Sequence, residues 1–265
     1  MLLTLMVKRQ RSCLRSMKNK KYTFGDVTFE IELPDTVNEN DNCMAFLSDK
    51  EPDYRIRICL TDEETVREKK PVRTGNVITK WMWRIPASGI STASILAKSE
   101  AAFLFLNHDA FILHAAYIVY NGQAILFTAP SGTGKSTQAA FWQTERGAEI
   151  INGDRVLVTR RNGRFFANGI YVSGTSGISK NRTVPIGSVV LLEQGDSNEK
   201  SDISPRMLFL RLLCECSYDM KSFEQCEKIT KLVADMINTV PVLCYRCKKS
   251  PDAVAALERI LWNRE

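Results

Sequence analysis

Acidic residues are missing from the first part of this 265-residue sequence. Residues 1–21 contain seven Lys or Arg and no Asp or Glu, so the remaining 244 residues carry a net charge of −1 out of the total of +6. A neutral body argues against a broad nucleic-acid-binding surface, and we expect no nucleic-acid partner. Residues 1–21 are expected to be a basic, disordered tail, and Met17 is a second candidate for the start.

Charged residues are also missing between Ala110 and Gly134, apart from a neutral His114. A run of this length raises the question of a membrane span. However, residues 121–123 (Asn-Gly-Gln) form a tight-turn signal inside it, and a second turn signal begins at Pro130. Two buried strands explain the run better, so we expect no membrane segment and no membrane partner.

We also expect no export signal, because the apolar residues 1–6 precede the basic cluster and are too few. We therefore expect a reducing, cytoplasmic compartment in which the eight cysteines are free thiols. The spacings Cys214-x-Cys216 and Cys244-x-x-Cys247 could suggest zinc. They lie in an apolar helical run and in a strand, so buried thiols are the preferred interpretation.

Hydrophobic residues make up 44% and charged residues 25% of the chain, which is typical of a globular protein. Alternating apolar and polar residues predict a β-rich N-terminal domain over 22–107, which ends in a helical pattern over 91–107. Residues 108–265 mix strands and helices and predict an α/β domain. Its expected strands are 111–120, 123–128, 148–151, 155–160, 164–171, 187–193 and 241–246, and its expected helices are 135–145, 204–216, 221–238 and 251–263.

The α/β domain contains a run that fits the Walker A pattern, a phosphate-binding loop motif, from Ala129 to Thr137. Glycines in this loop allow a tight turn whose backbone N–H groups point at one anion. Lys135 can reach the β- and γ-phosphates, and the Ser136 hydroxyl can bind Mg²⁺. The predicted nucleotide-binding residues are Ser131, Gly132, Thr133, Gly134, Lys135, Ser136 and Thr137. An apolar strand before the loop and a helix after it complete the expected context for binding ATP and Mg²⁺.

Two acidic residues could hold the metal beside this loop. Asp154 follows an apolar stretch, Ile150-Ile151, and lies 18 residues after Ser136. Glu193 follows four apolar residues, which is the more usual form of a metal-binding strand end. The residues alone leave both candidates open, as well as a solvent-facing role for either.

Residues 108–195 resemble HPr kinase/phosphorylase and its HPr-kinase-like relatives. Three features carry the resemblance. They are His114 in the second strand before the phosphate loop, the loop itself, and the short spacing from the loop to Gly153-Asp154. It implies a P-loop domain of the phosphoenolpyruvate-carboxykinase type. It also implies Asp154 as the metal ligand and oligomers, so a homo-oligomer is among the expected assemblies. The expected catalytic residues are Lys135, Asp154 and His114, with Asp154 or His114 assisting deprotonation of the acceptor hydroxyl.

The sequence departs from this family at two points. Gly153 matches the position of the acid usually assigned as the base, and no Asp or Glu occurs from Arg155 to Leu192, where the family supplies a metal-binding Glu. These departures put the bifunctional reaction on HPr in doubt. We expect a kinase that transfers the γ-phosphate of ATP to a hydroxyl of a peptide, a protein or a small molecule such as free serine.

The acid-free segment also carries six Lys or Arg, and residues 174–182 combine Gly, Ser and Thr with two of them. Such a loop can bind an anion through N–H groups and cationic side chains. We therefore predict that Lys180 and Arg182 contact the transferred phosphate or an acidic acceptor. A solvated basic loop is the plain alternative.

Two further functions stay open. The absence of the acid at position 153 favours a nucleotide-binding module that acts as a regulatory or complex partner without phosphotransfer. Carboxykinase activity on a keto acid ranks low, because only His108 and His114 could supply a histidine ligand for its additional metal. No motif separates ATP from GTP or names the acceptor.

Overall fold

The computed structural model describes residues 17–34, 42–61, 70–83 and 91–262. The chain divides into two compact units, Met1–Ala101 and Ala102–Glu265. This division lies six residues before the boundary that the sequence suggested, because Leu106 packs in the hydrophobic core of the second unit. Among the described residues, no helix has both the length and the apolar character needed to cross a bilayer.

The first unit is built on a five-stranded sheet in the order β1-β2-β3-β5-β4. Its strands are β1 (Met17–Phe24), β2 (Val27–Pro34), β3 (Tyr54–Thr61), β4 (Val72–Thr74) and β5 (Val77–Trp83). A short helix, α2 (Thr92–Lys98), follows, and the Ser91 hydroxyl caps it by accepting the Ser94 N–H at 3.1 Å. Tyr22, Phe24, Phe29 and Phe46 are fully buried beside this sheet.

Two expectations for this unit are corrected. Residues 17–21, which we expected in a disordered tail, form part of β1, where Lys21 lies opposite Glu30 of β2 and the opposite charges favour pairing. Residues 1–16 of the expected tail lie outside the described residues. The helical pattern over 91–107 is broken, because Glu100 has a φ of +55° and a 3₁₀ helix (Ala101–His108) follows.

The second unit contains a larger mixed sheet, in which the main strand order is β10-β9-β6-β7-β11-β14-β12. Its strands are β6 (Ala110–Tyr120), β7 (Gln123–Thr128), β8 (Glu149–Asn152), β9 (Arg155–Arg161), β10 (Arg164–Asn168), β11 (Thr183–Gln194), β12 (Glu199–Ser201), β13 (Cys216–Ser217) and β14 (Val242–Cys247). The strands β7, β11 and β14 are parallel to one another, whereas β6 is antiparallel to β7. The chain is therefore a mixed α/β protein with two sheets.

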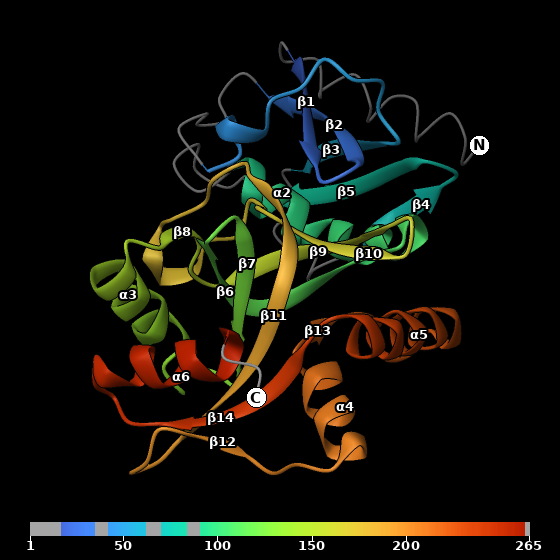
Figure 1. The fold of residues 1–265 in the computed structure, drawn as a ribbon. Helices are drawn as coiled ribbons and strands as arrows, with labels where there is room; N and C mark the ends of the chain where they lie inside the picture. Colours follow the sequence, from blue (N-terminus) through green and yellow to red (C-terminus); the bar gives the residue numbers. More distant parts are fainter. Residues whose placement is uncertain (1–16, 35–41, 62–69, 84–90, 263–265) are drawn as a thin grey trace, which may run out of the picture. The chain divides into compact units, whose positions relative to one another are not determined.

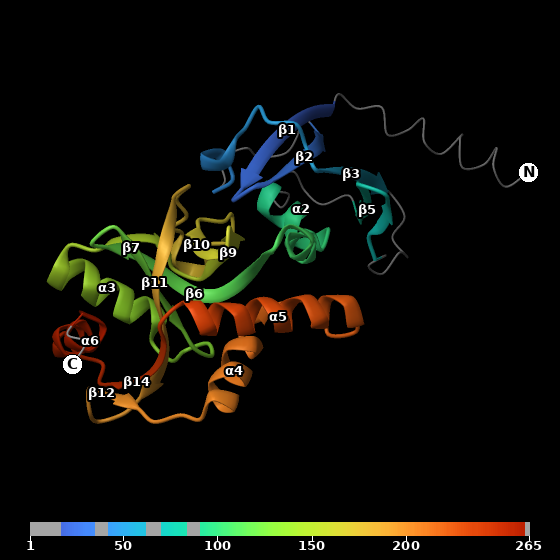
Figure 2. The same cartoon turned by 45° about the vertical axis from the view of Figure 1, so that its right-hand side comes forward.

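Helices cover both faces of this second sheet. The four helices are α3 (Lys135–Arg146), α4 (Pro205–Cys214), α5 (Phe223–Thr239) and α6 (Asp252–Trp262). Ile125 and Phe127 of β7 pack with α3 and α6, whereas the alternate residues Ala124 and Leu126 pack in the cluster that contains α5. Figures 1 and 2 show α3 and α6 on one side of β7 and β11, with α5 on the other.

Candidate functional site

The predicted phosphate loop connects β7 to α3 at the carboxyl end of β7. Gly132 and Gly134 have φ values of +82° and +113°, which a residue with a Cβ rarely adopts. Gly134 is the N-cap of α3 and offers no side chain to its first turn, so the N–H groups of that turn point toward the loop. This arrangement can bind an anion, and the positive end of the helix dipole adds to it.

Lys135 lies in the first turn of α3 with only 7% of its surface exposed. Its amine donates hydrogen bonds to the carbonyl oxygens of Ala129 at 2.7 Å and Pro130 at 3.3 Å. Burial lowers the pKa of this amine, and the nearby carboxylates of Glu215 and Asp154 act in the opposite direction. The two carboxylates thus favour the charged form of the Lys135 amine, which is the form that can bind a phosphate.

The rest of the loop is held by polar contacts. The Thr133 hydroxyl donates to the carbonyl oxygen of Pro130 at 2.9 Å. From the end of β11, Gln194 donates its side-chain amide to the carbonyls of Gly132 and Thr133 at 3.3 and 3.4 Å. Ser131 is exposed at the tip of the loop, and Thr137 is half-buried in the first turn of α3. Gln194 is a residue that the sequence patterns did not single out.

The two predicted metal ligands meet at Gly153. The Ser136 hydroxyl donates to the carbonyl oxygen of Gly153 at 3.1 Å, and Asp154 is the next residue. The buried side chain of Asn152 fixes this turn, because its oxygen accepts the N–H of Asp154 at 2.9 Å and its amide donates to the carbonyl oxygen of Val172 at 2.7 Å. The turn between β8 and β9 therefore brings the Asp154 backbone beside the first turn of α3.

His114 lies between two carboxylates. Its Nδ1 is 2.8 Å from Oε2 of Glu215, and its Nε2 is 3.5 Å from Oδ1 of Asp154. The backbone N–H of His114 also donates to the carbonyl oxygen of Glu215 at 2.8 Å. A carboxylate only accepts, so the ring donates through Nδ1 to Glu215, while Nε2 faces the carboxylate of Asp154. Glu215 was missed by the sequence analysis, which treated Cys214 to Cys216 as part of an apolar helix.

His114 lies in the middle of the second sheet, because β6 pairs along both of its edges. Residues Ala110–His114 pair with β9 on one edge, and Ala115–Tyr120 pair with β7 on the other. The Thr128 hydroxyl at the end of β7 donates to the carbonyl oxygen of His114 at 2.9 Å. The same strand β6 also pairs with β13, which follows Glu215.

Glu193, the alternative metal ligand, is engaged elsewhere. Its carboxylate accepts hydrogen bonds from Arg211 at 2.5 Å and from the Ser201 hydroxyl at 2.9 Å. Burial acts to raise the pKa of Glu193, yet these hydrogen bonds outweigh it and hold the pKa below its usual value. Glu193 is thus the acceptor in a local ion-pair cluster. Asp154 is paired as well, because Nε of Arg155 lies 3.3 Å from its Oδ2, but Asp154 is the carboxylate that follows Gly153, the partner of Ser136.

The residues present suit Mg²⁺ bound together with phosphates. Ser136 and Asp154 both offer oxygen ligands, and Mg²⁺ is commonly held by one or two carboxylates, substrate phosphates and water. Within the described parts of the chain, no group of three or more His, Cys, Asp or Glu side chains is arranged to hold a metal by itself. Ser136 and Asp154 could therefore supply two of the ligands of such an ion.

The space beside Gly153 is filled by another part of the chain. A Cβ atom added to Gly153 would lie 2.5 Å from Oγ and 2.7 Å from Cβ of Ser176. Gly174 packs against Asp154 in a similar way, because a Cβ atom added to Gly174 would lie 2.8 Å from Cγ of the Asp154 carboxyl. We call residues 173–177 the serine loop. It covers Gly153 and Asp154, and neither contact leaves room for a larger side chain.

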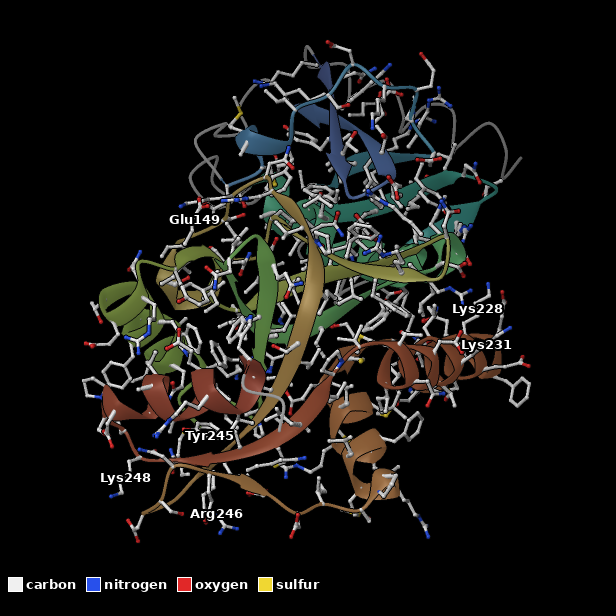
Figure 3. The ribbon with its side chains drawn as sticks, viewed as in Figure 1. Glu149, Lys228, Lys231, Tyr245, Arg246 and Lys248 are labelled. Atoms are coloured by element: carbon white, nitrogen blue, oxygen red, sulfur yellow. The ribbon has the colours of Figure 1, made fainter. Side chains whose placement is uncertain are left out.

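Lys180 and Arg182, predicted to bind the transferred phosphate or an acceptor, both pair with Glu149. The Lys180 amine is 2.9 Å from Oε1 of Glu149, and the Arg182 guanidinium contacts the other oxygen. Glu149 begins β8, whereas Asp154 lies just beyond its other end. Figure 3 shows Glu149 beside β8, on the other side of the unit from Tyr245 and Arg246 of β14. The structure thus brings the serine loop, but not these two cations, onto Asp154.

A cavity of about 330 Å³ lies away from this site. Its lining includes Gln123 at the start of β7, Leu243 of β14 and Trp262 of α6. The phosphate loop follows the opposite end of β7, so the cavity does not belong to the cluster around Asp154.

Comparisons with known proteins give little further guidance. No family model matches the sequence, and no curated protein matches it. Among solved structures, the chain is similar to the Hpr(Ser) kinase/phosphatase from Coxiella burnetii, with 16% sequence identity and a TM-score of 0.27. The match covers 36% of this chain and spans 66% of that chain, just under two thirds of its length.

Proposed function

We propose that the second unit is a P-loop domain that binds Mg-ATP and transfers the γ-phosphate to a hydroxyl acceptor. The acceptor class is a serine of a peptide, a protein or a free amino acid. One observation supports this most strongly: Ser136 of the phosphate loop donates to Gly153, the residue before Asp154, and the Asp154 carboxylate faces His114, which Glu215 contacts. Phosphoryl transfer needs positioning and charge neutralisation, and this cluster offers groups for both.

Each residue has a distinct part in the proposed reaction. Lys135 and the N–H groups of the loop bind the β- and γ-phosphates. Ser136 and Asp154 would hold Mg²⁺, which supplies neutralisation of phosphate charge when it is bound. Nε2 of His114 takes the proton of the acceptor hydroxyl, and Glu215 keeps the other ring nitrogen protonated and the ring oriented.

The acceptor is expected to approach from the side of β8. Lys180 and Arg182 share one partner, Glu149, so this edge keeps a net charge of +1. Both cations are about half exposed and remain accessible to a ligand. We therefore retain the proposal that they attract an acidic acceptor, rather than the transferred phosphate itself, because they lie at the end of β8 remote from Asp154.

Loss of γ-phosphate from Mg-ATP tests the proposal. The wild-type protein should release or transfer it, and Asp154→Asn should abolish Mg²⁺-dependent turnover while the thermal unfolding curve stays close to wild type. Glu193→Gln is the matched carboxylate control and should retain turnover once its folding is verified. Full activity of Asp154→Asn together with an inactive, folded Glu193→Gln would assign the metal to Glu193 and overturn this site.

A nucleotide-binding module without phosphotransfer is the second candidate. The observation that favours it is Gly153, where Ser176 occupies the space of the acid expected from the family resemblance. Tight binding of Mg-ATP, with no loss of γ-phosphate in the presence of candidate acceptors, would select this alternative.

A further inference from the structure

The serine loop places a hydroxyl group next to the proposed phosphate site. Gly153 lies between the Ser136 and Ser176 hydroxyl groups. Its carbonyl oxygen accepts the Ser136 hydroxyl at 3.1 Å, and its α-carbon faces the Ser176 hydroxyl. Ser176 Oγ would lie only 2.5 Å from a Cβ on Gly153. Gly153 alone therefore separates Ser176 from Ser136, whose hydroxyl would bind the metal of Mg-ATP.

The other end of the serine loop contacts the acidic side of the site. Gly174 packs on the Asp154 carboxyl, and Oδ1 of Asp154 in turn faces Nε2 of His114 at 3.5 Å. Ser176 and Gly174 thus rest on two consecutive residues, Gly153 and Asp154. The serine loop therefore lies directly against the proposed metal ligand Asp154 and against the residue that Ser136 contacts.

Ser176 is exposed and is held in place by contacts within its own loop. Its hydroxyl donates to the carbonyl oxygen of Ser173 at 2.7 Å and accepts the N–H of Ile178 at 3.3 Å. Gly174 and Gly177 flank it with φ values of +55° and +65°. Glycines on both sides allow the small backbone rotations that would bring the hydroxyl in line with the phosphorus.

We propose that Ser176 is an internal phosphate acceptor of this site, an inference that rests on the proposed kinase function. A bond forms between Ser176 Oγ and the γ-phosphorus of ATP, and the bond from that phosphorus to the β–γ bridging oxygen breaks. ADP leaves with the bonding electron pair, and the hydroxyl proton passes to water, to which Ser176 is exposed. The product places about −1.5 to −2 charges beside Asp154 and Arg155.

Mass spectrometry of the full chain tests this proposal directly. The protein is incubated with Mg-ATP and digested with trypsin, and the peptide spanning 165–180 is fragmented to locate phosphate. We expect one phosphoryl group on Ser176, lost in Ser176→Ala and in Lys135→Ala and retained in Ser176→Thr. Ser179→Ala is the matched control in the same peptide, because Ser179 is half-buried whereas Ser176 is exposed, so Ser179 should not compete.

The controls separate this proposal from the function on which it rests. Loss of γ-phosphate from ATP without phosphate on Ser176 would overturn the inference and leave the kinase proposal standing. Absence of both ATP turnover and phosphopeptide would overturn the two together. Two results would refute internal transfer by showing that another molecule is the donor. One is phosphate on Ser176 in Lys135→Ala, and the other is a rate constant for labelling, per protein molecule, that rises with protein concentration.

Discussion

Glu215 holds His114 through two contacts, one from its backbone and one from its side chain. The carbonyl oxygen of Glu215 accepts the His114 N–H at 2.8 Å, and its carboxylate lies 2.8 Å from Nδ1 of the same residue. The carboxylate is only 12% exposed, so it keeps the ring in one orientation with little competition from water. The ring nitrogen that faces Asp154 is thereby fixed.

Glu215→Gln should lower turnover more than it lowers the affinity for Mg-ATP. The amide cannot fix the ring proton on Nδ1 as a carboxylate does, and acid–base assistance of this kind is worth about 10²–10⁴ in rate. The measurements are steady-state kinetics and calorimetric titration with Mg-ATP. Glu199→Gln, an exposed carboxylate on β12, is the control and should behave as wild type. Unchanged turnover in Glu215→Gln would remove Glu215 from the proposed site.

Gly153→Ala should destabilise the protein, and Ser176→Gly should restore much of the loss. The new methyl group would lie 2.5 Å from Ser176 Oγ, and overpacking of this kind costs about 1–3 kcal/mol. Urea unfolding of the two single variants and the double variant gives their coupling energy, expected to be about 0.5–3 kcal/mol. Strict additivity would mean that the serine loop does not rest on Gly153.

Lys180→Ala and Arg182→Ala should leave both the fold and Mg-ATP binding close to wild type. Their pairs with Glu149 are exposed, and such surface pairs contribute about 0.2–1 kcal/mol. Thermal unfolding and calorimetric titration check the two expectations, with any effect on turnover appearing only when an acidic acceptor is supplied. A large loss of Mg-ATP affinity in either variant would place these cations at the phosphate itself.

Most longer elements of the second unit could be predicted from the sequence, because they depend on local patterns, whereas the short strands β12 and β13 and the first residues of β11 were not expected. The apolar run before Ala129 and the glycines of the loop led to β7 and α3 with boundaries that match within one residue. The helix over 91–107 could not be predicted correctly, since apolar spacing gives no sign of the positive φ at Glu100. The division at Ala101 likewise depends on which core buries Leu106.

The site was predicted only where its residues belong to one motif. Lys135 and Ser136 come from the loop motif, whereas Asp154 and His114 come from the family resemblance. Glu215 lies 61 positions after Asp154 and reaches the site because β13 pairs with β6, which is a tertiary contact. The contact of Ser176 with Gly153 and the pairing of Glu149 with two cations depend in the same way on chain packing that no short pattern contains.

Calorimetric titration with Mg-ATP tests the central claim, that the loop around Lys135 is a nucleotide site. We predict saturable binding by the wild type, and at least tenfold weaker binding by Lys135→Ala, because a hydrogen bond to a charged group contributes about 1.5–3 kcal/mol and 1.4 kcal/mol is a factor of ten. Lys248→Ala removes an exposed lysine beyond β14 and should bind as wild type. Equal affinities of the wild type and Lys135→Ala would contradict the account.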